Sequence, residues 1–468
     1  MFFHRVKSEG LAAHSYLIGS GKSAAVIDPR RDCEVYLDLA ARHAASIDYV
    51  FETHRNEDFV IGSLELAERT DAAIYHGDQV LFGYGQPLAD GQEFRLGEGA
   101  RLAALHTPGH TAESFSYVLT DLATGRSPVM VFSGDVLSVG SVGRLDLYGG
   151  GGREEEAGGL LYDSIAEKLL KVGEEVILCP AHGGGSVCGS GMAEREVSTL
   201  GLERRQNPAL QAKGREEFIR RQSAEPFFKP AYFAQMELLN LEGPPLSPLP
   251  RPRPLRPREF AQAMEDGALV LDTREPHSWA GAHLRGSYSV WLEGVAPYAG
   301  YVLPYGRPLL LVVEGEAQLE FARRSLYRLG YDLVVGYLAT AQTAPGELSG
   351  ALTSWYHQAL PIESTPTMSV QGLRSALEAG RCHVLDVRDE SEWAEGHIKE
   401  AQHIYVGELA SRLAEVPRDT EVAVHCSIGR RSGMAVSLLA RAGFKRVTTV
   451  LGGFGAWRAA GYPVEGSR

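Results

Sequence analysis

The C-terminal half of the chain contains one residue pattern twice, and this repeat restricts the folds of that half more than any other feature. The first copy has Asp272-Thr273-Arg274, Trp279 and His283-Leu284, and the second has Asp386-Val387-Arg388, Trp393 and His397-Ile398. Corresponding residues such as Asp272 and Asp386 are 114 positions apart. That spacing is typical of one small domain present twice in tandem.

Each copy begins with a short apolar run that ends in Asp-x-Arg, at 269–271 and at 384–385. A second apolar run follows, at 308–313 and at 422–425, and an amphipathic stretch comes after it. Strands that alternate with helices favour βα units around a parallel sheet. We therefore expect two α/β domains. In the first copy, Asp272-Thr273-Arg274 is expected to form a salt bridge or turn that holds the fold.

A proline-rich segment, 243–254, separates this repeat from the first part of the chain, because consecutive prolines favour an extended spacer. The residues before it alternate apolar strands with amphipathic stretches, as at 24–28, 35–45 and 48–51. The predicted domains are 1–242, a linker at 243–256, the first copy at 257–350 and the second copy at 366–466. The connection 345–366 is expected to be partly linker.

Charge and cysteine content exclude several classes of function. The net charge of −13 lacks the basic footprint of a nucleic-acid-binding protein or of one that binds anionic membranes. No apolar run approaches the ~18 residues of a membrane helix, and the charged N-terminus does not resemble a signal peptide. Five cysteines, an odd and sparse number, indicate a reducing cytoplasm and make each thiol a candidate for chemistry. They are Cys33, Cys179, Cys188, Cys382 and Cys426.

Histidines and aspartates follow apolar runs at four places in the first domain. They are His54 with Asp58, His110 in Thr-Pro-Gly-His-Thr, Asp135 in Ser-Gly-Asp, and His182 in Cys-Pro-Ala-His-Gly. Strand ends are where α/β proteins bind ligands, and these residue types are metal ligands. The pattern favours a metal site over isolated structural histidines.

These motifs resemble the metallo-β-lactamase superfamily over about residues 1–240, which implies an αββα sandwich. The sequence departs from the family pattern T-H-x-H-x-D-H at two positions, with Asn56 at the second histidine and Phe59 at the third. A two-zinc hydrolase of the glyoxalase II type would need both histidines. The set that remains is His54, His110 and Asp135, a two-histidine, one-carboxylate group suited to non-haem Fe(II).

By resemblance, this set matches the iron ligands of the persulfide dioxygenases, which implies one Fe(II) per chain, with zinc as the alternative. Gly-Arg144-Leu-Asp146 is similar to the stretch that follows the iron aspartate in those enzymes. Arg144 would support the site or bind an anionic part of the substrate, or would be a surface arginine. Asp58 is expected among the catalytic residues, and Asn56, Asp146 and His182 beside the ligands or in the pocket.

The last domain carries Cys426 at a strand end, followed by a predicted helix at 434–442. Backbone N–H groups and a helix N-terminus at that place stabilise a thiolate and form an anion pocket. A tyrosine phosphatase loop would need arginine where Ser432 stands. The loop instead resembles the rhodanese cradle C-x-x-G-x-R-S, and the resemblance covers about residues 366–466. It implies that Cys426 carries a persulfide, with Arg430 and Arg431 adding charge and Ser427, Ile428, Gly429 and Ser432 forming the cradle.

The first copy has no cysteine at this place, because alignment sets Val313 opposite Cys426. We expect it to be an inactive rhodanese-like domain with a structural role.

The combined resemblance implies sulfide detoxification. Fe(II) would oxidise the persulfide of a low-molecular-weight thiol with O₂ to sulfite, and Cys426 would make or consume thiosulfate. Two alternatives stay open, a zinc-dependent thioester hydrolase and a sulfurtransferase with a degenerate first domain. The expected partners are the persulfide, O₂ and sulfite or thiosulfate, without nucleic acid or membrane. A homo-oligomer is an arrangement that the sequence leaves open.

Overall fold

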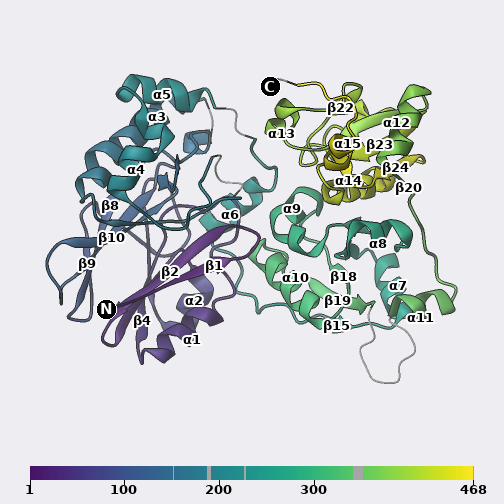
Figure 1. The fold of residues 1–468 in the computed structure, drawn as a ribbon. Helices are drawn as coiled ribbons and strands as arrows, with labels where there is room; N and C mark the ends of the chain where they lie inside the picture. The colour runs from purple at the N-terminus through teal and green to yellow at the C-terminus, as the bar shows by residue number, and fades with distance from the viewer. Residues whose placement is uncertain (151, 187–190, 226–227, 341–350, 467–468) are drawn as a thin grey trace. The chain divides into compact units, whose positions relative to one another are not determined.

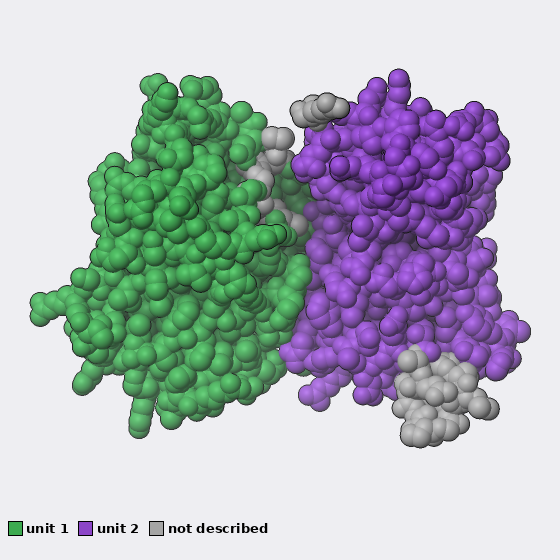
Figure 2. Space-filling model, viewed as in Figure 1, with its two compact units in different colours: residues 1–248, 328–330 green, residues 249–327, 331–468 purple. Residues whose placement is uncertain are grey.

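The computed structural model describes residues 1–150, 152–186, 191–225, 228–340 and 351–466. The chain divides into two compact units (Figure 2). Unit 1 comprises Met1–Pro248 with Arg328–Gly330, and unit 2 comprises Leu249–Tyr327 with Tyr331–Arg468.

Unit 1 contains two six-stranded sheets, and Figure 1 labels some of their strands. The first has the order β1-β2-β3-β4-β5-β6, antiparallel from β1 to β3 and parallel from β3 onwards. Its strands are β1 Phe2–Ser8, β2 Ala13–Ser20, β3 Ser23–Ile27, β4 Ser46–Phe51, β5 Ala73–His76 and β6 Gln86–Pro87. The second has the order β14-β13-β10-β9-β8-β7. Its strands are β7 Glu93–Leu96, β8 Ala100–His106, β9 Phe115–Asp121, β10 Pro128–Gly134, β13 Ile177–Pro180 and β14 Ser198–Thr199.

The core of unit 1 lies between the two sheets. Alternate residues of β8, Ala100, Leu102 and Ala104, are fully buried, as a strand with one face in the core requires. They share one apolar cluster with Phe51 of the first sheet and Tyr117 of the second, whose ring centroids are 5.1 Å apart. Aromatic packing between the sheets therefore fixes their separation.

Helices cover the outer face of each sheet. Tyr36 and Leu66, from α1 Glu34–Arg42 and α2 Ser63–Thr70, pack in one apolar cluster with the first sheet. Residues of α3 Glu154–Asp163, α4 Leu200–Gln206 and α5 Arg215–Ser223 pack in another with the second sheet. A further helix, α6 Phe233–Glu242, follows. The predicted αββα sandwich is confirmed.

Unit 2 contains two five-stranded parallel sheets with the same strand order, as the repeat predicts (Figure 1). The first has the order β15 Arg253–Pro254, β19 Val334–Ala339, β18 Leu309–Val313, β16 Leu269–Asp272, β17 Tyr288–Ser289. The second has the order β20 Thr367–Met368, β24 Val447–Val450, β23 Glu421–His425, β21 Cys382–Asp386, β22 Ala401–His403. The helices are α7 Pro257–Glu265, α8 Pro276–Gly281, α9 Val295–Val302, α10 Glu316–Arg328 and α11 Ala351–His357, then α12 Val370–Glu378, α13 Glu390–Glu395, α14 Arg430–Arg441 and α15 Gly453–Ala459.

The Asp-x-Arg segment forms the expected salt bridge in the first copy, and the second copy has the same ion pair. Arg274 Nη2 lies 2.6 Å from Asp272 Oδ2, and Arg388 Nη2 lies 2.6 Å from Asp386 Oδ2. Both carboxylates are fully buried, so each needs this charge partner at the end of its strand.

Two boundaries of the first copy differ from the sequence prediction. Residues 253–254, expected in the linker, form β15 because their backbone pairs with β19. Helix α11 lies where the connection 345–366 was expected to be partly linker, because Leu352 and Trp355 join the apolar cluster around Phe260. The segment 341–350 lies outside the described residues.

Cysteines and hydrophobic helices bear on two further expectations. Cys33, Cys179, Cys382 and Cys426 are free thiols, and Cys188 lies outside the described residues. None of the described helices has the length and apolar character needed to cross a membrane.

Candidate functional site

His54, His110 and Asp135 come together at the strand ends of unit 1. His54 follows β4, His110 lies between β8 and β9, and Asp135 directly follows β10. The Nε2 atoms of His54 and His110 each lie 3.8 Å from the same oxygen, Asp135 Oδ2. All three side chains are buried, so the structure assembles the three predicted ligands around one point.

Hydrogen bonds fix the two imidazoles so that their Nε2 atoms face this point. His54 Nδ1 lies 2.9 Å from Thr53 Oγ1, and His110 Nδ1 lies 3.1 Å from the Arg144 carbonyl oxygen. The two Nε2 atoms are buried and have no hydrogen-bond partner among the described residues. Ligating histidines are held through the other ring nitrogen in this way. The donors therefore fit a metal ion.

The charge states of the three donors also fit a metal ion. Burial lowers the pKa of His54 to about 3, against the opposing field of Asp135, and burial also lowers the pKa of His110. Burial alone would raise the pKa of Asp135, but His182 and the two other histidines hold it well below its usual value. Neutral imidazoles and an anionic carboxylate are the forms that bind metal.

The His182 imidazole contacts two carboxylates, one of which is the candidate ligand Asp135. Its Nδ1 lies 2.8 Å from Asp135 Oδ1, and its Nε2 lies 3.2 Å from Asp58 Oδ2. Burial opposes its protonation, but Asp135 and Asp58 raise the pKa of His182 well above its usual value. His182 thus holds both aspartates in place, and Asp58, expected among the catalytic residues, contacts the cluster through His182.

A cavity of about 250 Å³ in unit 1 reaches His182. Lys7, His14, Gly183 and Arg195 are among its lining residues. It gives a small molecule a route to the edge of the donor cluster.

Arg144 and Asp146 form a pair next to the cluster. Arg144 Nε lies 2.7 Å from Asp146 Oδ1, and its Nη2 also donates to the Phe228 carbonyl oxygen at 3.1 Å. Arg144 is only 2% exposed, so it is not a surface arginine. Its backbone carbonyl, rather than its guanidinium, contacts His110.

Asn56 and Phe59 occupy the two positions where a two-zinc hydrolase has histidines. Asn56 Nδ2 donates to the His54 carbonyl oxygen at 3.3 Å. The Phe59 ring is buried, with its centroid 6.4 Å from the His182 ring. Neither side chain replaces the lost nitrogen ligand.

The sequence prediction missed Glu57. Its carboxylate, with His54 and His110, forms a group whose ligand atoms all lie within 4.8 Å of one another. Its side chain is fully buried, and neither oxygen has a hydrogen-bond partner among the described residues. The available signal was an acidic residue three positions after His54 in the same strand-end loop.

In unit 2, Cys426 lies at the predicted strand end, directly before α14. The Gly429 N–H donates to Cys426 Sγ at 3.1 Å, and Ser432 Oγ lies 3.9 Å from the same sulfur. Gly429 has a φ of 108°, which favours glycine, and this conformation turns the chain from the loop into α14. Helix α14 starts at Arg430, four residues earlier than the expected start at 434, so its N-terminus lies at the loop.

The two loop arginines both pair with carboxylates. Arg431 Nη1 lies 2.6 Å from Glu392 Oε2, and Arg431 Nη2 donates to Ser427 Oγ at 2.9 Å. Arg430 Nη2 instead lies 3.0 Å from Glu275 Oε1, which belongs to the first copy. Ile428 is 66% exposed at the loop tip.

Strand register places Val313 opposite Cys426. Asp272 pairs with Val312 across β16 and β18, and Asp386 pairs with His425 across β21 and β23. The residue after His425 is Cys426, and the residue after Val312 is Val313. The first copy therefore has an apolar side chain where the second has its thiol.

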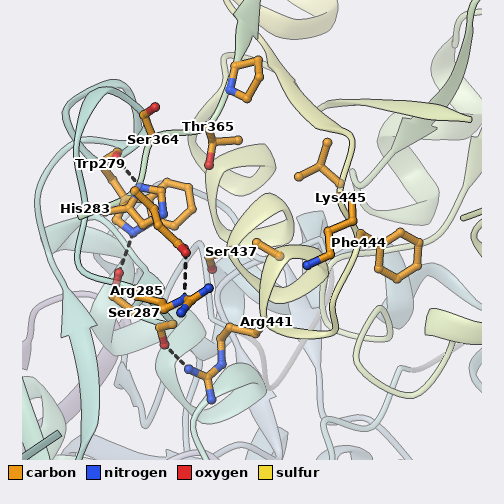
Figure 3. Close-up of a pocket in the computed structure, with 15 residues that line it drawn as sticks. Trp279, His283, Arg285, Ser287, Ser364, Thr365, Ser437, Arg441, Phe444 and Lys445 are labelled. Atoms are coloured by element: carbon orange, nitrogen blue, oxygen red, sulfur yellow. Dashed lines mark hydrogen bonds and ion pairs between the residues drawn. The ribbon is translucent and has the colours of Figure 1, made fainter. Parts of the chain in front are cut away.

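Unit 2 also contains a cavity of about 500 Å³ that the cysteine loop, 426–432, does not line (Figure 3). Figure 3 shows Trp279, His283 and Arg285 on one side and Ser437 and Lys445 on the other. Arg285 is paired with Glu363 at 2.8 Å. The cavity is therefore separate from the thiol site.

Two family models match the chain. Residues 9–182 match the metallo-beta-lactamase superfamily, and residues 369–460 match the rhodanese-like domain. A solved metallo-beta-lactamase structure from Staphylococcus aureus is 30% identical, with a TM-score of 0.64, and covers 72% of this chain and 98% of that one.

Two other similar proteins match part of the chain. The cytoplasmic hydroxyacylglutathione hydrolase of Arabidopsis thaliana is 35% identical over 136 residues, which are 28% of this chain and 51% of that protein. The solved structure of ETHE1 from Myxococcus xanthus is 28% identical, with a TM-score of 0.45, and covers 52% of this chain and 99% of that one.

The chain spans about half the length of several curated relatives that it matches, 47% for a mycobacterial protein and 55% for a putative sulfur carrier protein of Bacillus subtilis. Together, the fold and the two family models show that this chain combines a metallo-beta-lactamase domain with a C-terminal rhodanese-like domain.

Proposed function

We propose that unit 1 binds one Fe(II) and oxidises the persulfide of a low-molecular-weight thiol, and that Cys426 transfers sulfane sulfur. One observation carries the first part. The Nε2 atoms of His54 and His110, both without a partner among the described residues, converge on a single oxygen of Asp135. Two histidines and one carboxylate with open positions form the ligand set of non-haem Fe(II) oxygenases.

Bound iron supplies O₂ activation, which protein side chains do not provide. The net reaction is RSSH + O₂ + H₂O → RSH + SO₃²⁻ + 2H⁺. The sulfane sulfur loses four electrons and O₂ gains four. The protein's own residues hold the site: Thr53 and the Arg144 carbonyl orient the imidazoles, and His182 keeps Asp135 anionic. The cavity that reaches His182 admits the substrate.

The second part of the proposal is carried by the loop around Cys426. The thiolate attacks the sulfane sulfur of a donor, and the outgoing thiolate or sulfite leaves with the electron pair of the broken S–S bond. The resulting persulfide then gives this sulfur to sulfite, which makes thiosulfate, or to a thiol. The Gly429 N–H and the α14 N-terminus favour negative charge on the sulfur. The first copy, an inactive rhodanese-like domain in this proposal, has Val313 at this place.

Metal analysis combined with O₂ uptake tests the first part. We expect near-stoichiometric iron in the protein purified without added metal, and O₂ consumption on addition of glutathione persulfide or coenzyme A persulfide. His110→Ala should abolish both. His106→Ala is the matched control, because His106 contacts the Ala112 carbonyl oxygen and not the cluster. Zinc, or no metal, without O₂ uptake on either persulfide would contradict the proposal.

Zinc-dependent thioester hydrolysis is a second candidate, favoured by the 35% identity to the hydroxyacylglutathione hydrolase of Arabidopsis thaliana. Hydrolysis of a glutathione thioester by the zinc-loaded protein, without O₂ uptake, would support it. A third outcome is that the protein shows neither O₂ uptake nor thioester hydrolysis, but transfers sulfur and loses this activity in Cys426→Ser. Unit 2 would then be the active part.

A further inference from the structure

We propose that Glu57 is a fourth ligand of the metal ion at His54, His110 and Asp135. This inference rests on the metal centre of the proposed function. The ligand atoms of Glu57, His54 and His110 lie within 4.8 Å of one another, and both imidazoles also face Asp135 Oδ2 at 3.8 Å. Glu57 and Asp135 are thus both close to the same two imidazoles.

The buried carboxylate of Glu57 needs a positively charged partner. Its side chain is 0% exposed, and neither carboxylate oxygen has a hydrogen-bond partner among the described residues. Buried carboxylates in proteins are paired, hydrogen-bonded or bound to metal. No described residue donates a close hydrogen bond to Glu57, and the nearest cation, Arg55, is 3.6 Å away.

Arg55 is the cation nearby, and other carboxylates share it. Arg55 Nη2 lies 3.6 Å from Glu57 Oε1 and 3.9 Å from Glu237 Oε2. Its backbone N–H donates to Glu113 Oε1 at 3.2 Å. Lys229 Nζ lies 2.7 Å from Glu237 Oε1, so Glu57 and Glu113 are the carboxylates that depend on Arg55. A divalent cation beside Glu57 would balance the negative charge that Arg55 alone does not.

A fourth ligand changes the chemistry expected of the site. Two carboxylates and two neutral imidazoles cancel the charge of a divalent ion and form a donor set richer in oxygen. Such a set suits iron or manganese better than a set with a third histidine does. Glu57, His54, His110 and Asp135 would together hold the ion, and the iron would supply the O₂ chemistry of the proposed function.

Metal affinity of the apoprotein tests this assignment without relying on activity. We compare wild-type chain with Glu57→Gln, using Fe(II) under anaerobic conditions and Zn(II), each in competition with a chelator. We expect at least tenfold weaker binding in the variant, since even outer partners of ligands contribute about 10–100-fold. The electron paramagnetic resonance signal of the Fe(II)–nitric oxide complex should also change.

Glu113→Gln is the matched control, because it removes a buried carboxylate beside Arg55 that is outside the donor group. A lower melting temperature for apo Glu57→Gln, with wild-type metal affinity and an unchanged nitric oxide signal, would overturn the assignment and make Glu57 an ion-pair partner of Arg55. Glu57→Asp, which keeps the charge, should retain part of the affinity. O₂ uptake is measured separately, so the proposed function can stand when this inference fails.

An independent observation in unit 2 carries a second inference, which rests on sulfur transfer by Cys426. We infer that Glu275 selects against anionic sulfur donors. Glu275 Oε1 pairs with Arg430 Nη2 at 3.0 Å, and Glu293 Oε2 lies 3.9 Å from Arg430 Nη1. Glu392 already takes the other loop arginine, Arg431. The first copy thus neutralises the one loop cation that its own domain leaves unpaired.

A loop without net positive charge gives little attraction to thiosulfate, a dianion. A thiol persulfide carries at most one charge on its sulfur and depends less on Arg430. Cys426 should therefore take sulfur from a thiol persulfide in preference to thiosulfate. Packing supports the contact, because a Cβ atom at Gly433 in α14 would lie 2.5 Å from Pro276, the residue after Glu275.

Steady-state kinetics with cyanide as acceptor test this selection. The thiosulfate steps are Cys–S⁻ + S₂O₃²⁻ → Cys–S–S⁻ + SO₃²⁻ and Cys–S–S⁻ + CN⁻ → Cys–S⁻ + SCN⁻. In Glu275→Gln we expect kcat/KM for thiosulfate to rise several-fold, more at low salt, and kcat/KM for glutathione persulfide to change less than twofold. Glu363→Gln, on the Arg285 pair away from the loop, is the control. An equal change for both donors, or none, would refute the selection, whereas no transfer from either donor would refute the role of Cys426.

Discussion

His54 donates its Nδ1 proton to the hydroxyl oxygen of Thr53, 2.9 Å away. Thr53 Oγ1 in turn donates to Asp28 Oδ2 at 2.7 Å, so the hydroxyl must accept from the imidazole. This chain of hydrogen bonds selects the tautomer whose Nε2 lone pair faces Asp135. A residue outside the ligand set thereby determines whether His54 can bind metal.

Thr53→Val should weaken metal binding about 10–100-fold while the fold is kept, because the imidazole loses the group that orients it. Thr53→Ser keeps the hydroxyl and should bind like the wild type. Competition titration of the apoprotein with Fe(II) or Zn(II) measures the effect. Equal affinity in the valine and serine variants would show that the hydroxyl does not orient His54.

Asn240 on α6 fixes the backbone of the loop that follows β4 and carries His54. Its Nδ2 donates to the carbonyl oxygens of Asn56 at 2.6 Å and Phe59 at 2.8 Å, and its Oδ1 accepts from the Ile61 N–H at 3.0 Å. Asn240→Ala leaves three buried backbone groups unpaired, so we expect unit 1 to lose about 2–4 kcal/mol of unfolding free energy.

Urea denaturation, with the metal content of each variant, measures this loss. Leu238→Ala on the same helix is the control, because Leu238 is 46% exposed. An equal, small loss in both variants would contradict the role assigned to Asn240.

Glu392 should make the last domain sensitive to acid. Burial would raise its pKa, but hydrogen bonds from Arg431 and its neighbours lower the pKa of Glu392 to about 2. A carboxylate with a lowered pKa stabilises the folded state above its unfolded pKa of 4.5 and loses this contribution as the pH falls towards 2. After allowance for solvent screening, we expect a loss of about 1–2 kcal/mol in that window.

Thermal unfolding of the full chain between pH 5 and pH 2.5 tests whether stability falls with pH in this way. The melting temperature of Glu392→Gln should depend less on pH than that of the wild type. Glu390→Gln, which removes an 82% exposed carboxylate from the same helix, should not. A steeper loss of stability at low pH in Glu392→Gln than in the wild type would show that ionised Glu392 does not stabilise the fold.

Sequence patterns predicted where the candidate ligands gather better than they predicted the surroundings of those residues. His54, His110 and Asp135 follow strands whose apolar runs are visible in the sequence, so the topology brings them to one edge. Glu57 was missed because nothing in its sequence context shows that its carboxylate is buried without a hydrogen bond. The pairing of Arg430 with Glu275 was also missed, because it depends on contacts between residues 155 positions apart.

Gly429 should control the reactivity of Cys426. Its N–H donates to Sγ at 3.1 Å, and its φ of 108°, which turns the chain into α14, is a conformation that an L-residue with a Cβ adopts at a cost of about 1–2 kcal/mol. Gly429→Ala should turn this N–H away and slow alkylation of Cys426 by iodoacetamide several-fold at pH 7. Gly461→Ala, at a φ of 70° with open space around it, carries a similar backbone cost far from the loop and should alkylate at the wild-type rate. If both variants react alike, the N–H does not stabilise the thiolate and the cradle assigned to Cys426 is wrong.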